Sequence, residues 1–185
     1  NCDFVNNKSS KPFSELTQMV RNAHIGGSVP IILGGEQSIT FGALKAINDL
    51  YPEVSILHFD AHTDLKSEVR SNKYNHLCTM RRIVETMPEV KLVQLGVRNI
   101  SRDEKDYLEK ETPNVEIFFA KEKDKWNLTD ILTSLTKNVY ISFDFSVFDI
   151  SFMPSTGKPE PGGLQWFQIL DIIKNVCAFK EVVGI

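Results

Sequence analysis

Cysteine is scarce in this 185-residue sequence: Cys2, Cys78 and Cys177 are widely separated and contain no Cys-x-x-Cys pair. This spacing predicts neither a disulfide framework nor a cysteine-ligated zinc site, and it is typical of a protein kept in a reducing compartment. Long apolar runs are also missing, since none reaches the ~18 residues that a membrane-spanning helix requires. We therefore expect a cytoplasmic protein without membrane contact.

Positive charge is not in surplus either. The sequence has 21 Lys and Arg against 24 Asp and Glu, with a formal net charge of -3 and a pI near 5.8. Because polyanion binding usually requires clustered basic side chains, a nucleic-acid partner is not expected. With 42% hydrophobic residues and no linker or repeat, the sequence predicts a single domain over residues 1–185. The start at Asn1 and the stop at Ile185 suggest that this domain is truncated at both ends.

Short apolar runs alternate with longer amphipathic ones along the chain. The short runs predict six buried strands, over residues 29–33, 54–59, 92–97, 115–119, 139–143 and 182–185. The longer ones predict helices over residues 13–23, 38–49, 78–86, 103–111, 128–137 and 164–176, with Ser101 and Glu104 as a capping box. Because parallel crossovers are usually helical, we expect an α/β fold with three α/β/α layers and a mostly parallel central sheet.

Polar residues follow two of these strands directly, at the sheet edge where parallel folds place their ligand sites. Asp60, His62 and Asp64 occupy alternate positions, which in extended backbone project to one side. Taken alone, this triplet fits equally well a loop whose aspartates cap the next helix. Asp144 ends another strand in the same way, and carboxylates buried together require a cation. The two segments together favour a metal site, and such ligands suit Mn²⁺ or Mg²⁺ better than zinc.

Three ordered segments resemble the signature motifs of the ureohydrolase family, which includes arginase and agmatinase. They are Leu33-Gly34-Gly35-Glu36-Gln37-Ser38-Ile39-Thr40, His58-Phe59-Asp60-Ala61-His62-Thr63-Asp64 and Ser142-Phe143-Asp144-Phe145-Ser146-Val147-Phe148-Asp149. A loop that is similar to the family's Pro- and Gly-rich loop follows, at Pro154, Thr156, Gly157, Pro159, Pro161, Gly162 and Gly163. The resemblance covers almost the whole chain and implies an arginase-like fold.

The same resemblance implies a site with two manganese ions that hydrolyses a guanidino or amidino group. Asp60 and Asp144 would bridge the ions. Asp64 would complete the first ion's shell and accept a hydrogen bond from the hydroxide, while His62 would bind the second ion. His76 matches a family histidine that relays protons near the substrate, although a lone histidine is also typical of an ordinary surface position. The resemblance further implies a homo-oligomer, either a trimer or a hexamer.

Two ligand positions depart from the family's pattern. Gln37 stands where the first motif has histidine, and Ser146 stands where the third has aspartate. Both side chains are neutral and bind metals weakly, so each ion loses a ligand. We expect that one ion, or none, is retained, at a position formed by Asp60, Asp64 and Asp144 with the Gln37 oxygen.

The stretch from Tyr74 to Arg82 resembles the agmatinase branch, and Leu65-Lys66 replaces the Ile-Asn of arginases. We therefore expect a hydrolase of linear amidines that acts on a small cationic substrate, with agmatine converted to putrescine and urea. Lys66 and Arg70 leave open a carboxylated amidine such as formiminoglutamate. The alternative is a non-catalytic relative that serves as a structural or regulatory subunit. A deacetylase-like zinc hydrolase matches the glycine and Pro-Gly motifs less well.

Overall fold

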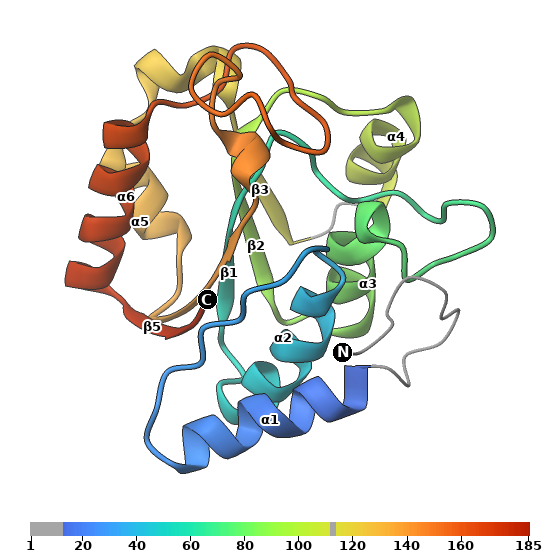
Figure 1. Cartoon of the computed structure of the whole chain (residues 1–185), viewed down its shortest axis with the longest axis vertical. Helices are drawn as coiled ribbons and strands as arrows, with labels where there is room; N and C mark the ends of the chain where they lie inside the picture. The colour runs from blue at the N-terminus through green and yellow to red at the C-terminus, as the bar shows by residue number, and fades with distance from the viewer. Residues whose placement is uncertain (1–12, 112–113) are drawn as a thin grey trace.

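The computed structural model describes residues 13–111 and 114–185, so Cys2 lies outside the described residues. At its centre is a parallel sheet in the order β3-β2-β1-β4-β5 (Figure 1). The strands are β1 (Ser55–Phe59), β2 (Lys91–Val97), β3 (Val115–Phe119), β4 (Asn138–Phe143) and β5 (Glu181–Gly184). Five of the six expected strands are therefore confirmed.

Helices cover both faces of the sheet, which confirms the three-layer α/β/α architecture (Figure 1). One core lies beneath α1 (Phe13–Ile25), α2 (Ile39–Leu50), α3 (Thr79–Thr86) and α4 (Arg102–Glu111). A second core lies beneath α5 (Leu128–Ser134) and α6 (Trp166–Phe179). Short 3-10 turns occur at η1 (His76–Cys78), η2 (Ala120–Lys125) and η3 (Phe145–Val147). Within the described ranges, no helix is both long and apolar enough to cross a membrane.

The central strand β1 is buried along its whole length because helices pack on both sides of it. Ile56 points into the core under α1 and α2, whereas Leu57 and Phe59 point into the core under α5 and α6. This two-sided burial explains why the strand is a nearly continuous apolar run. It also means that a polar side chain in β1, such as His58, is fully buried and must find partners inside the protein.

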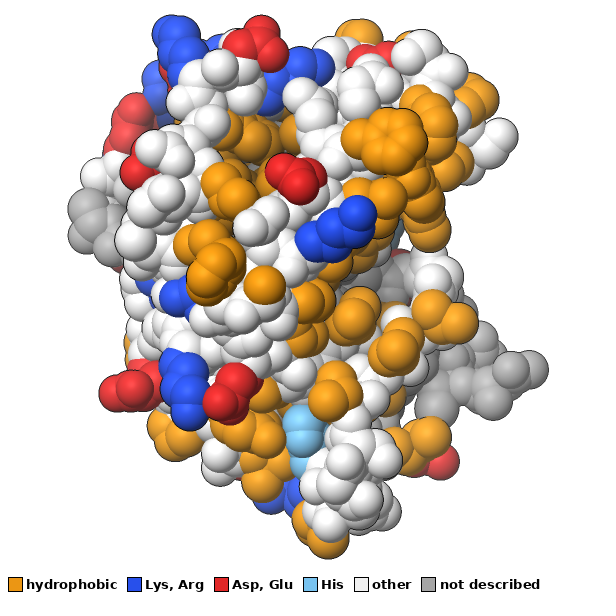
Figure 2. Space-filling model, turned by 90° about the vertical axis from the view of Figure 1, so that its left-hand side faces the viewer, with side chains coloured by type: hydrophobic (Ala, Val, Ile, Leu, Met, Phe, Trp, Pro, Cys, Tyr) orange, Lys and Arg blue, Asp and Glu red, His pale blue; other side chains and the backbone are white. Residues whose placement is uncertain are grey.

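The expected strand over residues 29–33 is wrong. The segment makes two backbone hydrogen bonds with the end of β5: Ile32 N–H donates to the Ile185 oxygen (2.8 Å), and Ile185 N–H donates to the Pro30 oxygen (3.0 Å). Pro30 has no N–H to extend the ladder, and Leu33 is 93% exposed. Figure 2 views the molecule from the left of Figure 1, the side of α6, and shows hydrophobic side chains at that surface. The run is apolar, but only one face of it is covered.

A buried carboxylate, Glu104, fixes the loop that follows β1. Its Oε1 atom accepts hydrogen bonds from Thr63 Oγ1 (2.7 Å) and from Leu65 N–H (3.2 Å). Its Oε2 atom accepts from the backbone N–H (2.8 Å) and the hydroxyl of Ser101, and Ser101 Oγ accepts in turn from Glu104 N–H (3.4 Å). These reciprocal bonds confirm the predicted capping box, and they join the start of α4 to the loop after β1.

The guanidinium of Arg98, just after β2, ties a second group of loops together. Among the described residues, its hydrogen-bond acceptors are all main-chain oxygens, those of Gly96, Ser146, Val147, Phe148, Glu160 and Pro161. A guanidinium carries five donors in a rigid fork, which suits several carbonyls converging from different segments. Arg98 therefore holds η3 and the Pro-Gly loop against the end of β2.

The role of Glu104 predicts a large stability difference between two neighbouring variants. Glu104→Ala would leave buried donors of Thr63 and Leu65 unpaired, so we expect the free energy of unfolding to fall by about 2–4 kcal/mol. Asp103→Ala is the matched control, because Asp103 lies in the same helical turn but is exposed and makes only 3.4 Å contacts to Ser67. We expect it to change stability by about 0.5 kcal/mol or less in urea denaturation. Equal losses in the two variants would show that the buried network does not stabilise the fold.

Candidate metal centre

The predicted site residues meet at the carboxyl ends of β1 and β4, which are paired neighbours in the sheet. A cavity of about 410 Å³ opens there, lined by Gly35, Glu36, Gln37, Asp60, His62, Asp64, His76, Leu77, Asp144, Ser146, Gly157 and Lys158. A larger hollow of about 620 Å³ adjoins it and shares Gln37 and Asp144 with it. All seven side chains predicted from the sequence thus line one cavity.

Asp60 is the most strongly hydrogen-bonded carboxylate of the cavity. Its Oδ1 atom accepts from His62 N–H (2.8 Å), from the Ser146 hydroxyl (2.7 Å) and lies 3.0 Å from His62 Nδ1. Its Oδ2 atom lies 3.3 Å from His58 Nε2. Burial by itself would raise the pKa of Asp60, but the hydrogen bonds from His58, His62 and Ser146 outweigh it and hold that pKa well below its usual range. Asp60 is therefore ionised although it is buried.

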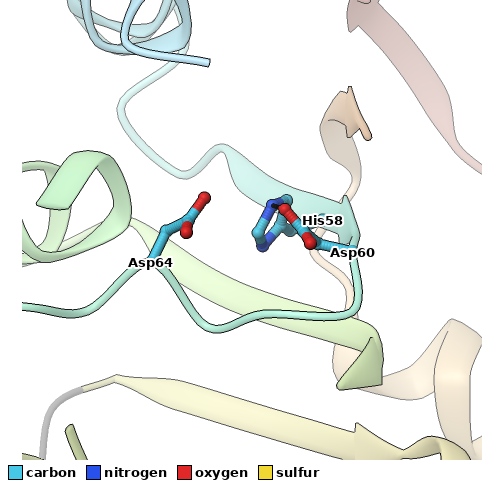
Figure 3. A group of neighbouring side chains, drawn as sticks. All are labelled: His58, Asp60 and Asp64. Atoms are coloured by element: carbon cyan, nitrogen blue, oxygen red, sulfur yellow. Dashed lines mark ion pairs between the residues drawn. The ribbon is translucent and has the colours of Figure 1, made fainter. Parts of the chain in front are cut away.

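Asp64 lies in the opposite electrostatic situation. Burial raises the pKa of its carboxyl well above the ordinary value, and the negative charges of Asp60 and Asp144 raise it further. The backbone of Asp64 adopts the left-handed conformation (φ 51°), which aspartate tolerates better than most residues. The predicted extended stripe is therefore wrong in this detail, because β1 ends at Phe59 and the chain turns before it reaches Asp64. The turn places the Asp64 side chain near Asp60 (Figure 3).

His58 belongs to the site but was not predicted from the sequence. Ligand atoms of His58, Asp60 and Asp64 all lie within 4.8 Å of one another, at the end of β1 and in the loop after it (Figure 3). His62 and Asp144 are not part of this close group. The signal that could have identified His58 is the two-residue period of a strand, which directs positions 58 and 60 to the same side.

Hydrogen bonding shows that His58 acts as a donor in this arrangement. The Gln94 amide donates to the Thr63 oxygen and to His58 Nδ1, both at 2.8 Å. Because Nδ1 accepts, the imidazole proton resides on Nε2, which faces Asp60. A nitrogen that carries a proton has no lone pair for a cation. Distance alone would make His58 a metal ligand, but its tautomer makes it a support for Asp60.

The Gln37 side chain lies between the two buried carboxylates. The orientation of its amide that pairs donors with acceptors has the oxygen accepting from His58 Nε2 and the nitrogen donating to Asp64 and to Asp60 Oδ2 (3.2 Å for the latter). The amide hydrogens thus supply positive partial charge between Asp60 and Asp64. A half-turn of the amide would direct its oxygen to the same place, as a ligand for a cation.

The donor set is suitable for a hard divalent ion. The carboxylates of Asp60, Asp64 and Asp144 all line the cavity, and the repulsion among them is what a cation would relieve. Among the described residues, the buried Nε2 atom of His62 has no hydrogen-bond partner, and it lies 3.6 Å from Glu160 Oε1. Ser146 is a poorer candidate ligand, since its hydroxyl already donates to Asp60 and accepts from Ala61 N–H (3.2 Å).

The cavity rim carries two further charged groups. His76 Nδ1 lies 3.4 Å from Glu36 Oε1, and the hydrogen bond from His76 lowers the pKa of Glu36. Neither Lys66 nor Arg70 is among the residues that line the cavity, whereas Lys158 is. Lys158 was not predicted as a site residue, although a lysine within a Pro-Gly loop directly after the motif of Asp144 was a visible signal.

Comparison with known proteins identifies relatives of this architecture. The sequence model of the arginase family matches residues 1–185. The N(1)-aminopropylagmatine ureohydrolase of Thermococcus kodakarensis is 38% identical over 158 residues, which cover 85% of this chain and 52% of the relative. The agmatinase of Pyrococcus horikoshii is 35% identical over 157 residues, which cover 85% and 53%. The chain thus spans about half the length of these curated relatives.

A solved structure agrees with the sequence relatives. The crystal structure of a putative agmatinase from Clostridium difficile superposes with a TM-score of 0.84 at 27% identity, covering 99% of this chain and 66% of that one. This likeness includes the sheet and the helical layers on both of its faces.

The opposite pKa shifts of Asp60 and Asp64 predict opposite effects of neutralising each side chain. In the presence of a metal chelator, the Asp64→Asn substitution should raise the free energy of unfolding at pH 7 by about 1 kcal/mol or more. Because its pKa is raised on folding, folded Asp64 binds its proton more tightly than the unfolded chain does, whose pKa is about 3.9, so this group makes stability fall as pH rises from there. The gain should therefore vanish near pH 4.

Asp60→Asn provides the counterpart with the reverse sign. The lowered pKa of Asp60 stabilises the fold above about pH 4, and that stabilisation is lost as pH falls through the folded-state pKa. Asp60→Asn should thus destabilise the protein at pH 7 and much less in acid. Urea denaturation of the natural chain and both variants between pH 4 and 7 measures how the effect of each substitution on the free energy of unfolding changes with pH. If the two effects changed with pH in the same direction, the opposite pKa shifts assigned to Asp60 and Asp64 would be contradicted.

Proposed function

The chain belongs to the arginase family, and from this premise we propose that it is a metal-dependent hydrolase of linear amidines that converts agmatine to putrescine and urea. The observation that supports the proposal is the single cavity lined by Asp60, Asp64, Asp144 and His62. Members of this family generally depend on a metal. Since the chain covers about half of its curated relatives, the activity is proposed for the protein of which these residues form the metal-binding part.

We propose that one divalent ion, Mn²⁺, is held by Asp60, Asp64 and Asp144, with the Gln37 oxygen after its amide has turned. Such an ion, when bound, acidifies water and so provides a nucleophile near neutral pH. The second position is weakened, because Ser146 supplies a hydroxyl that is engaged with Asp60. His62, whose Nε2 atom has only the Glu160 carboxylate nearby at 3.6 Å, is the remaining protein ligand there.

The protein groups have separate tasks in this proposal. Burial and neighbouring charge raise the pKa of Asp64, so a divalent ion that binds this carboxylate would relieve its repulsion with Asp60 and Asp144. His76 is half exposed at the rim and oriented by Glu36 at 3.4 Å, which suits proton exchange between the departing amine and solvent. The carboxylates attract a cationic guanidinium.

The second candidate function is a non-catalytic subunit, and one observation favours it. The Gln37 amide and the Ser146 hydroxyl provide hydrogen-bond donors to Asp60 and Asp64, so these carboxylates have partners without any ion. A site satisfied in this way could persist after catalysis was lost. For either function, we propose a cytoplasmic homo-oligomer, a trimer or hexamer, on the basis of the family resemblance.

Urea release tests the catalytic proposal against the alternative. The natural chain and a Gln37→His, Ser146→Asp double variant would be incubated with Mn²⁺ and either agmatine or N(1)-aminopropylagmatine, the compound in a relative's name. We expect slow urea release from the natural chain and a gain of about 10- to 100-fold in kcat/KM for the double variant, because two ligands are restored. Asp144→Asn in both backgrounds is the control, and it should abolish release.

The possible results separate the two functions. Activity in both proteins that is lost with Asp144→Asn supports the hydrolase. Activity in the double variant alone identifies a protein that has lost catalysis, which favours the subunit. If neither protein releases urea from either substrate, the proposal is contradicted.

Metal content gives an independent prediction. After dialysis against micromolar Mn²⁺, elemental analysis should find at most one ion per natural chain, because the second position lacks its carboxylate. The double variant should retain about one ion more. Two tightly held ions in the natural chain would contradict the weakened second position.

A further inference from the structure

Lys158 lines the carboxylate cavity, and the backbone that follows it is held in place by hydrogen bonds. Pro159 follows it, which restricts Lys158 to extended conformations. Beyond that proline, the carbonyl of Glu160 accepts from Arg98 Nη2 (2.8 Å), and the N–H of Gly162 donates to Asp149 (2.8 Å). The segment that carries Lys158 is thus anchored to the end of β2 and to the loop after η3.

The ammonium of Lys158 has no local carboxylate partner. Within residues 13–111 and 114–185, no carboxylate oxygen lies within 4.0 Å of it, so its charge is not neutralised by an ion pair. That charge still acts on the cavity at longer range. Burial and the neighbouring carboxylates raise the pKa of Asp64, and the positive charge of Lys158 opposes that rise.

A charge count for the cavity gives Lys158 a specific meaning. Asp60, Asp64 and Asp144, the three candidate aspartate ligands, contribute three negative charges when all are ionised, whereas Glu36 lies at the rim, 3.4 Å from His76 Nδ1. One divalent ion would leave one negative charge uncompensated, and Lys158 balances it. A second divalent ion would instead leave a positive excess among these groups, which is unfavourable.

We propose that Lys158 is the resident cation of this site: it takes the place of part of the charge of a second ion and lowers the affinity of the cavity for added cations. The inference rests on the proposed function, because it concerns the same carboxylates. It assigns a specificity-determining role to Lys158, since its positive charge opposes the approach of a guanidinium substrate or a divalent ion to Asp60, Asp64 and Asp144.

Calorimetric titration with Mn²⁺ alone tests the inference on the whole chain. Lys158→Gln removes the charge and should tighten Mn²⁺ binding about three- to tenfold at low ionic strength. Lys158→Arg keeps the charge and should leave the affinity unchanged. Lys66→Gln is the matched control, because it removes a lysine that does not line the cavity. Lys158 is exposed, so the gain should shrink toward unity in about 0.5 M salt, where screening acts within a few ångströms.

The same titrations in the Gln37→His, Ser146→Asp background keep the test decisive if the natural chain binds Mn²⁺ too weakly to measure. The inference is supported if Lys158→Gln, but neither Lys158→Arg nor Lys66→Gln, tightens Mn²⁺ binding and if high salt removes that gain. Equal affinities for Lys158→Gln and Lys66→Gln, a gain that salt does not reduce, or no Mn²⁺ binding by any variant would overturn it. Urea release is a separate readout: a chain that releases no urea but binds Mn²⁺ more tightly after Lys158→Gln refutes the hydrolase and leaves the role of Lys158 standing.

Discussion

The placement of several acidic side chains at the buried ends of two adjacent strands is the constraint on which this site depends. Carboxylates removed from water require hydrogen-bond donors, protons or cations. The protein meets this requirement differently at each position: Asp60 receives donors from His58, His62 and Ser146, whereas Asp64 is left with a raised pKa and the Gln37 amide. The differences between these two aspartates follow from which neighbours can donate, and the chemistry proposed for the site follows from those differences.

The frame around the carboxylates is independent of them. Glu104 fixes the loop after β1 through Thr63 and Leu65, and Arg98 fixes the loops after β2 and β4 through main-chain oxygens. None of these contacts uses a candidate metal ligand side chain. The arrangement explains how Gln37 and Ser146 can lie beside these carboxylates in a chain whose architecture still matches the structure of a putative agmatinase.

Much of the fold could be predicted from the sequence, because buried strands, amphipathic helices and the capping box of Ser101 and Glu104 each have a local pattern. Residues 29–33 were mispredicted because an apolar run does not reveal whether a neighbouring strand covers it. The site residues at strand ends were also predictable, since two-residue spacing and strand boundaries can be recognised in the amino-acid sequence. His58 and Lys158 have sequence signals for their positions, but their roles do not, because those roles depend on Gln94, which sets a tautomer, and on a loop that the chain folds back over the cavity.

The way Arg98 binds its loops has a consequence for how this protein can change over time. Within the part of the chain that the structure describes, every partner of its guanidinium is a peptide oxygen, which any amino acid provides. These hydrogen bonds therefore do not depend on which side chains the loops carry. Mutation can therefore introduce new residues at positions such as 146 and 160 while the surrounding architecture is retained. The reaction at the site can therefore change during evolution while the fold that carries it stays the same.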